Sequence, residues 1–162
     1  MSESNFTLRV LTQADAEAIA AWRYPAPYDL YNHDAIPTIE VVASFLDPSL
    51  HYYGVFDSSS RLVAFRCFGP DAQVIGGDYS LEALDMGGGL RPDLTGRGMG
   101  QTVLGVAMSF AKLKFSPTLF RTTVASFNQR ALTVCQKLGY RAKLEFSRTT
   151  DHRRFTILIR EA

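Results

Sequence analysis

One segment constrains the fold more than any other: a strand end that passes through a Gly-x-Gly-x-Gly turn into a helix. The turn contains Gly96, Gly98 and Gly100, and a helical apolar pattern follows from about Met99. Glycine permits the tight backbone, and the unpaired amides of a first helical turn face one point, where the helix end is positive. Arg97 adds a formal charge. The segment predicts an anion site, with an ordinary strand-to-helix connection as the alternative.

The spacing of these glycines differs from that of two common phosphate loops. A dinucleotide fingerprint needs Gly-x-Gly-x-x-Gly, and a Walker loop ends in Gly-Lys-Ser/Thr. A different phosphate ligand is therefore predicted. The chain has 17 basic and 16 acidic residues, which gives no general attraction to nucleic acid or to an anionic membrane. We expect neither as a partner, and we expect the anion site to be local.

Hydrophobic periodicity predicts strands and helices on both sides of the turn. The first strand has Phe6, Leu8 and Val10 on its inner side, and Thr12 and Thr38 are the predicted N-caps of the first two helices. This order predicts an α/β fold with a mixed sheet. The expected strands are 6–11, 50–56, 61–68, 81–90, 119–125, 140–147 and 155–160, and the expected helices are 14–22, 38–46, 99–116 and 128–138.

The length of 162 residues suffices for one core, so residues 1–162 are expected to form a single domain. No basic start followed by an apolar run opens the chain, and no stretch is long enough to span a bilayer. Cys67 and Cys135 have no CxxC or metal-ligand spacing, which favours a reducing, cytoplasmic location. The three histidines show no paired metal spacing either, so no metal is expected.

At the glycine turn the sequence resembles the GNAT superfamily of acyl-CoA-dependent N-acyltransferases, whose signature Gln/Arg-x-x-Gly-x-Gly/Ala joins the fourth strand to the third helix. The segment from Thr95 to Gly100 matches this signature, with threonine at the first position. Asn128, Ala131 and the pair Gly139-Tyr140 match a second recurring pattern. The resemblance covers nearly the whole chain and implies a central twisted, mostly antiparallel sheet of about seven strands, flanked by about four helices.

The resemblance also implies acetyl-CoA as co-substrate. Its pyrophosphate would lie on the glycine turn, its pantetheine arm beside the asparagine, and its thioester against fourth-strand amides that splayed strands leave unpaired. The glycines at 87–89 suit a close approach of ligand to backbone. The residues expected to contact acetyl-CoA are Gly89, Leu90, Thr95, Gly96, Arg97, Gly98, Met99, Gly100, Gln101 and Asn128.

Acyl transfer to an amine needs a neutral nucleophile, and a carboxylate can serve as its base. We expect Asp85 in this role because burial in the apolar run 83–86 could raise its pKa, with Glu82 as the second choice. The alternative is a structural pair between Asp85 and an arginine such as Arg66. Many relatives have a tyrosine acid where this chain has Cys135. We expect Cys135 to be a dispensable core residue.

The segment from Tyr24 to Pro37, called the aromatic loop below, is rich in tyrosine and proline. By the resemblance it borders the acceptor site. Aromatic faces can hold a cationic amine, with Asp29 and Asp34 adding negative charge, whereas the alternative is that the rings only pack the loop. The expected substrate-binding residues are Trp22, Tyr24, Tyr28 and Tyr31.

Together these features predict an N-acetyltransferase. It would move an acetyl group from acetyl-CoA to a primary amine, of a small molecule or a peptide, by direct attack in a ternary complex. The departures at Thr95 and Cys135 leave open a different class, a non-catalytic coenzyme A binding or sensing domain. The sequence names neither the acceptor nor the assembly, for which a homodimer is one possibility.

Overall fold

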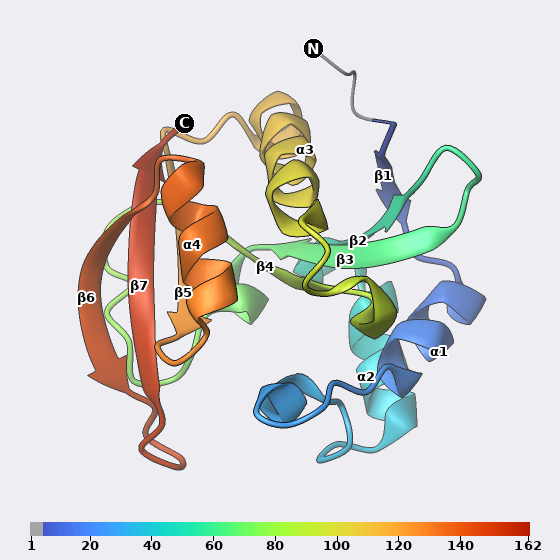
Figure 1. The fold of residues 1–162 in the computed structure, drawn as a ribbon, viewed down its shortest axis with the longest axis horizontal. Helices are drawn as coiled ribbons and strands as arrows, with labels where there is room; N and C mark the ends of the chain where they lie inside the picture. Colours follow the sequence, from blue (N-terminus) through green and yellow to red (C-terminus); the bar gives the residue numbers. More distant parts are fainter. Residues whose placement is uncertain (1–4) are drawn as a thin grey trace.

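The computed structural model describes residues 5–162 and has a seven-stranded sheet (Figure 1). Within the described residues the strand order is β1-β2-β3-β4-β5-β7-β6, and only β4 and β5 are parallel neighbours. The seven strands and the four α-helices of the described residues confirm the predicted fold class. The strands are β1 (Thr7–Val10), β2 (Tyr52–Phe56), β3 (Leu62–Phe68), β4 (Leu84–Leu90), β5 (Leu119–Ala125), β6 (Arg141–Ser147) and β7 (Arg154–Glu161). The helices are α1 (Gln13–Ala21), α2 (Thr38–Leu46), α3 (Met99–Phe115) and α4 (Gln129–Lys137).

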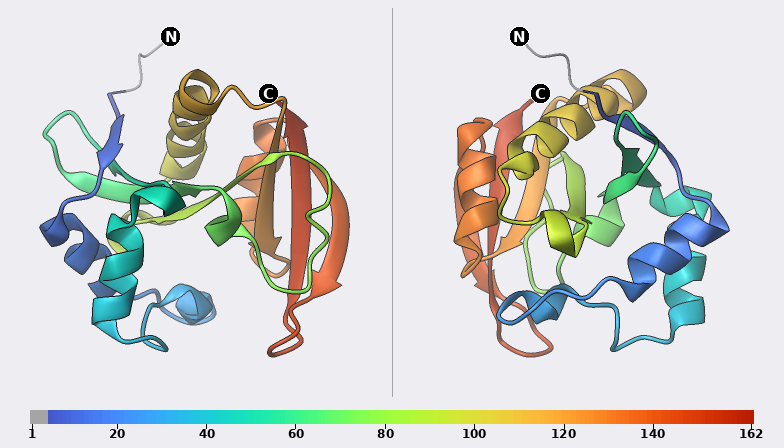
Figure 2. Two further views of the ribbon diagram at one scale, coloured as in Figure 1. Left: turned by 180° about the vertical axis from the view of Figure 1, so that it is seen from behind. Right: turned by 45° about the vertical axis from the view of Figure 1, so that its right-hand side comes forward.

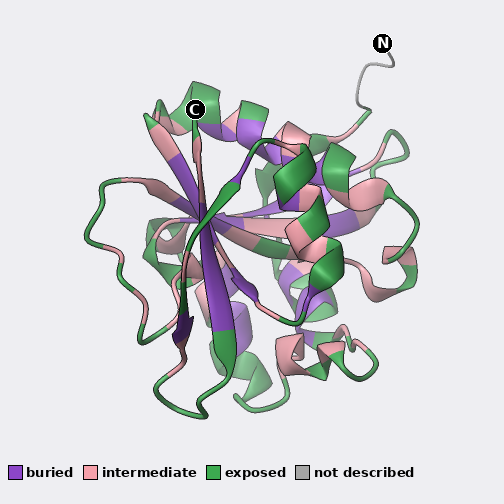
Figure 3. Cartoon of the chain, turned by 60° about the vertical axis from the view of Figure 1, so that its left-hand side comes forward, coloured by how far each residue is buried: buried purple, intermediate pink, exposed green. Residues whose placement is uncertain are grey.

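Helices α3 and α4 lie on one face of the sheet and α1 and α2 on the other, as Figures 1 and 2 show. On one face α3 and α4 pack over a core that includes Phe68 and Met86 from the strands and Met108 from α3. On the other face α1 and α2 enclose a second cluster around Ile19 and Phe45. On this second face the helices cover only the side formed by β2 and β3, and loop residues pack on β5, β7 and β6. In Figure 3 the buried residues, in purple, are concentrated on the strands in the middle of the sheet. The amphipathic patterns therefore place a core on both faces of the strands that carry the glycine run.

The two predicted helix caps have different outcomes. Thr12 caps α1, because its hydroxyl accepts the Asp15 amide at 3.2 Å and the Asp15 carboxylate accepts the Thr12 amide at 2.9 Å. This reciprocal pair satisfies two amides that the helix leaves free. The prediction for Thr38 is wrong, because Pro37 occupies the N-cap position and Thr38 is the first helical residue. The Pro37 carbonyl already accepts the Val41 amide at 3.2 Å, so the helix begins one residue earlier.

The first strand is shorter than predicted, and its inward pattern ends early. β1 pairs only with β2 at the edge of the sheet. Leu8 packs on the core, but Val10 is 65% exposed, so its predicted inward position is wrong. The chain turns toward α1 after the strand, and Leu11 is the residue buried there. The alternation therefore breaks where the strand ends.

β4 begins at Leu84, three residues later than predicted, because residues 81–83 belong to an irregular connection. It pairs with β5 only from Leu84 to Met86, opposite residues 120–122. Beyond this point β4 continues along β3, while β5 continues along β7. The two strands therefore diverge, and Figure 1 shows them running apart.

Two further findings concern the environment of the chain. Cys67 and Cys135 are both buried and free. Within residues 5–162, the helices are all too short or too polar to cross a membrane.

Candidate functional site

The divergence of β4 from β5 leaves uncovered a stretch of β4 that has almost no side chains. The range Gly87 to Gly89 pairs with β3, whereas pairing with β5 stops at Met86, whose carbonyl accepts the Thr122 hydroxyl at 3.0 Å. Gly88 has a φ of +143°, and a Cβ at this residue would lie 2.1 Å from the Phe65 carbonyl oxygen. Only glycine fits this backbone, and the run leaves the strand open to close approach by a ligand.

A short 3-10 helix, Pro92–Leu94, connects β4 to the glycine turn and α3. Gly98 has a φ of +79° and is the N-cap of α3, with no side-chain hydrogen bond at the cap. The first-turn amides therefore lack a capping side chain, and such amides bind anions. Thr95, where the signature has Gln or Arg, donates its hydroxyl to the Pro92 carbonyl at 2.8 Å. The Thr95 hydroxyl thus forms a hydrogen bond inside the connection between β4 and α3.

Two arginines flank the glycine turn, of which the sequence predicted only Arg97. Arg130, in the first turn of α4, approaches the turn so closely that a Cβ on Gly96 would lie 3.1 Å from its Nη1. Its Nε donates to the Tyr28 hydroxyl at 3.0 Å, and its guanidinium carbon lies 4.1 Å from the centre of the Tyr28 ring. A cation in a first helical turn opposes the helix dipole. That local conflict was the signal that could have identified Arg130.

The aromatic loop reaches the glycine run of β4 through Tyr24. The Tyr24 hydroxyl donates to the Leu90 carbonyl at 2.5 Å, and a Cβ on Gly89 would lie 2.8 Å from this hydroxyl oxygen. The Tyr24 amide donates to the Asn32 side chain at 2.6 Å, which fixes the loop. Burial raises the pKa of Tyr24, so the group stays a hydrogen-bond donor at neutral pH.

Asn128 lies across the divergence from Tyr24, after the end of β5. Its Oδ1 accepts the Ala131 amide at 3.1 Å and caps α4, and its Nδ2 donates to the Tyr31 hydroxyl at 3.0 Å. The Tyr31 ring packs edge-on to the Tyr24 ring at 6.4 Å. Burial is the main cause that raises the pKa of Tyr31. The two tyrosines thus link the end of β4 to the start of α4.

Trp22, the fourth expected substrate-binding residue, packs in a different cluster from the three tyrosines. The Trp22 ring packs against Phe65 at 6.1 Å, in the cluster between α1 and α2. Asp29 and Asp34 are both exposed. The structure therefore brings Tyr24, Tyr28 and Tyr31 together beside β4 and α4 but does not bring Trp22 to them.

Asp85, the predicted base, forms a buried ion pair. Its two oxygens accept the Nε and Nη2 of Arg121 at 2.6 and 2.8 Å, and the Gln73 amide adds a third hydrogen bond at 2.9 Å. Both charged side chains are about 5% exposed or less. The Asp85 carboxylate raises the pKa of Arg121. This geometry supports the structural alternative, but the suggested partner Arg66 is wrong: the partner is Arg121 on the parallel strand β5.

The other two candidates for proton transfer differ in burial. Glu82 is exposed, in the connection that precedes β4. Cys135 is buried in the core between α4 and the sheet. Burial raises the pKa of the Cys135 thiol to about 11. The packing agrees with a core role for Cys135, and its dispensability stays a prediction.

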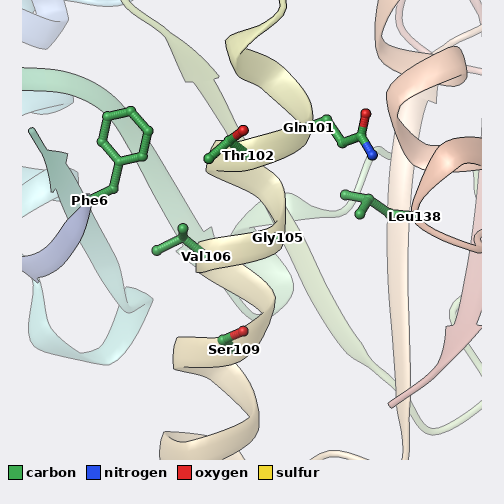
Figure 4. A pocket seen from close by; sticks show the side chains of 7 residues that line it. All are labelled: Phe6, Gln101, Thr102, Gly105, Val106, Ser109 and Leu138. Carbon is green, nitrogen blue, oxygen red and sulfur yellow. The ribbon is translucent and has the colours of Figure 1, made fainter. Parts of the chain in front are cut away.

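A cavity of about 580 Å³ lies along the exposed side of α3 (Figure 4). Among the predicted contact residues only Gln101 lines it, together with Phe6, Val106 and Leu138. None of its lining residues comes from β4 or from the aromatic loop. The cavity is therefore separate from the glycine run.

Comparison with known proteins identifies the fold. No protein-family model and no curated protein matches the sequence. Solved structures do match: a spermidine N-acetyltransferase chimera from Vibrio cholerae and hSSAT has a TM-score of 0.75 at 14% identity, over 98% of this chain and 96% of that one. A GNAT-family acetyltransferase from Bacillus anthracis has a TM-score of 0.72 at 12% identity, over 99% and 96%. The aminoglycoside acetyltransferase AAC(6')-Ib in complex with coenzyme A has a TM-score of 0.75 at 15% identity, over 96% and 94%.

Proposed function

We propose that this chain, which has the GNAT fold, is an N-acetyltransferase that moves an acetyl group from acetyl-CoA to a primary amine. One observation carries the proposal: a strand with three consecutive glycines diverges from its neighbour and is followed, after a short 3-10 helix, by the glycine turn and a helix N-terminus without a side-chain cap. Such an arrangement offers free backbone groups to an extended ligand and a positive end to its phosphates. It suits acetyl-CoA, which has both parts.

The residues of the site divide the binding of acetyl-CoA among them. The amides from Gly98 to Gln101 would accept the pyrophosphate, with Arg97 and Arg130 supplying two positive charges. The backbone at Gly88 and Gly89 would face the pantetheine arm and the thioester. The remaining expected contacts, which fall on the same stretch of chain or on α4, are Leu90, Thr95, Gly96, Met99, Gly100 and Asn128.

The amine would approach along the aromatic loop. Tyr24, Tyr28 and Tyr31 provide three rings beside the divergence, and the exposed Asp29 adds a negative charge. The structural neighbours are named for spermidine and aminoglycosides, which are amines. We infer a cationic amine as the acceptor, because aromatic faces and carboxylates both attract positive charge.

Two finer aspects of the proposal concern the setting of the enzyme. We propose a cytoplasmic location, which two free thiols favour, and a homodimer as the assembly. Light scattering coupled to size-exclusion chromatography tests the dimer: a mass of about twice the 18.0 kDa chain supports it, and a mass equal to one chain contradicts it.

The test begins with calorimetric titration of the purified protein with acetyl-CoA. Gly98→Asp places a carboxylate at the helix N-terminus, and Gly98→Asn, the matched control, has nearly the same size without the charge. Both replacements meet the same positive φ, which asparagine and aspartate tolerate better than most residues. We expect aspartate to weaken binding about tenfold or more relative to asparagine, since a like charge replaces an attraction to the phosphates. Absence of binding by the folded wild type would refute the proposal.

An amine panel then separates catalysis from binding alone. Spermidine, an aminoglycoside and a lysine peptide are incubated with acetyl-CoA, and the release of free thiol is measured. Transfer to any of them supports an acetyltransferase. Saturable binding of acetyl-CoA without transfer or hydrolysis favours the non-catalytic coenzyme A module instead.

Arg130 has its own control in this chain. Arg130→Gln removes the cation beside Gly96, whereas Arg141→Gln removes an exposed cation from the start of the edge strand β6. We expect weaker acetyl-CoA binding only for Arg130→Gln, with a shallower dependence on salt because one charge contact is lost. Equal affinities of the two variants would remove Arg130 from the site.

A further inference from the structure

Arg66 lies on β3, directly opposite Gly88 in the glycine run of β4. The next pair on the same face joins Phe68 to Met86, and both of these residues lie in the core under α3 and α4. Side chains two residues apart on a strand share a face. The Arg66 side chain is therefore on the face that carries α3, α4 and the glycine turn, and Gly88 has no side chain to cover it.

The Arg66 side chain is half-buried, and its guanidinium contacts no carboxylate among residues 5–162. Its Nε is buried and makes no hydrogen bond within the same residues. Arg121, by contrast, shares its burial with a carboxylate. A buried donor without an acceptor costs stability, and such donors rarely stay unsatisfied in folded proteins. The exception calls for a ligand that supplies the acceptor.

The titratable groups around Arg66 do not supply a negative charge at neutral pH. They are Cys67 on its own strand, Cys135 on α4 and Tyr140 at the start of β6. Burial raises the pKa of both thiols to about 11 and raises that of Tyr140 as well. The Tyr140 hydroxyl donates to the Met86 sulfur at 3.9 Å. All three groups therefore stay protonated at neutral pH, and none of them gives Arg66 a negative partner.

Arg66 lies close to the point where β4 and β5 begin to diverge, just after Met86. An arm that starts at the glycine turn and follows β4 inward passes Gly89 and Gly88, and beyond Met86 the strands are paired and closed. The reactive end of such an arm must therefore stop beside the last residues without a β5 partner. Gly88, the residue opposite Arg66, is one of them.

We propose that the Arg66 guanidinium contacts the thioester end of bound acetyl-CoA and stabilises the negative charge that develops on it during transfer. This inference rests on the proposed function. In the reaction the amine nitrogen forms a bond to the carbonyl carbon, the C–S bond breaks with its electron pair going to sulfur, and the amine loses a proton to solvent. Arg66 keeps its own protons and acts through its charge, which is strong where water is excluded. It would do so without a proton-donating side chain at Cys135.

The test uses free coenzyme A, so it needs neither the acceptor nor turnover. A cation beside the sulfur lowers the pKa of the bound thiol, by about 1 to 3 units for a close opposite charge. The thiolate is followed by ultraviolet absorbance against pH, and a complex with an analogue that lacks the thiol provides the blank. The same blank removes the absorbance of the two protein thiols, whose pKa burial raises to about 11.

Three variants locate the cause of the shift. Arg66→Met should abolish the shift while the sulfur-free analogue still binds as to wild type, and Arg66→Lys should keep part of it. Arg160→Met removes another arginine near Tyr140 and should leave the shift unchanged. A bound thiol that titrates in the wild type as it does in solution overturns the proposal, even if Arg66→Met fails to fold. So does a shift that survives in Arg66→Met. Absence of coenzyme A binding altogether removes the proposed function first, so the two failures are distinguishable.

Discussion

The two halves of β4 are consecutive in the chain but differ in their neighbours and in their side chains. The first half, Leu84 to Met86, pairs with β5 and holds the buried ion pair between Asp85 and Arg121. The second half, from Gly87 onward, has lost β5 as a neighbour and carries almost no side chains. One half is closed by side chains of the protein itself, and the other offers its backbone to a ligand. The seven residues of β4 thus contain a buried ion pair that supports the fold and a backbone edge that is open to a ligand.

The comparison explains why the carboxylate of Asp85 on this strand does not by itself identify a catalytic base. Asp85 is in the closed half, where a guanidinium and an amide use three of the roughly four lone-pair positions of its carboxylate. Beside the open half, the Nε of Arg66 is buried and has no hydrogen-bond partner among the described residues. The closed half is therefore expected to govern stability and the open half binding.

The largest expected effect tests the closed half. Asp85→Asn leaves Arg121 buried without its counter-charge, so we expect the free energy of unfolding to fall by about 3 kcal/mol. Glu82→Gln, at the exposed second candidate for the base, should change it by less than about 0.5 kcal/mol. Urea denaturation measures both. A stable Asp85→Asn protein that binds acetyl-CoA but has lost transfer would restore Asp85 as the base.

The second prediction tests whether the open half needs glycine. A Cβ at Gly88 would meet the Phe65 carbonyl oxygen at 2.1 Å, at a φ that side chains avoid, so Gly88→Ala should cost about 1 to 3 kcal/mol. Gly105→Ala in α3 meets no neighbour within 4 Å and should stabilise by about 0.5 to 1 kcal/mol. Thermal unfolding with far-ultraviolet circular dichroism compares the pair. Equal stability of the two variants would show that the backbone at Gly88 can relax.

The fold was predictable because its signals are local. Alternating strands, helical apolar stripes and the glycine turn each occupy a few consecutive residues, and these predictions agree with the observed elements. The errors occur where tertiary context decides. Val10 follows the strand pattern but lies at the end of an edge strand, and residues 81–83 look like a strand but lack a β-partner.

The site was only partly predictable for the same reason. The glycine run and turn are contiguous in the sequence, whereas the partner of Asp85 depends on the parallel register between β4 and β5. A sequence pattern cannot choose between Arg66 and Arg121, which lie on the two strands that flank β4. Tyr24 and Leu90 are 66 residues apart in the sequence, and neither segment has a pattern that predicts their contact.

The third prediction concerns the aromatic loop, which contacts the open half through Tyr24. Tyr24→Phe removes the hydrogen bond to the Leu90 carbonyl, and we expect a loss of about 1 kcal/mol in stability. It should also increase hydrogen exchange in the aromatic loop, because the loop loses its contact with β4. Tyr28→Phe, which removes only the contact with the exposed Arg130, should leave exchange at Tyr24 unchanged. Identical exchange in the two variants would mean that Asn32 alone fixes the loop.

The smallest expected effect tests whether acetyl transfer needs the Cys135 thiol of α4 as a proton donor, or only the charge of Arg66 and the backbone of the open half. Cys135 is buried behind this half, and its raised thiol pKa of about 11 makes it a weak acid at neutral pH. Cys135→Ala should therefore leave acetyl transfer unchanged and lower the free energy of unfolding by about 1 kcal/mol or less. The measurement pairs the transfer rate at saturating acetyl-CoA with denaturation of the same sample. If the rate falls steeply while the fold persists, the thiol supplies the proton, and the charge of Arg66 is not sufficient for departure of the sulfur.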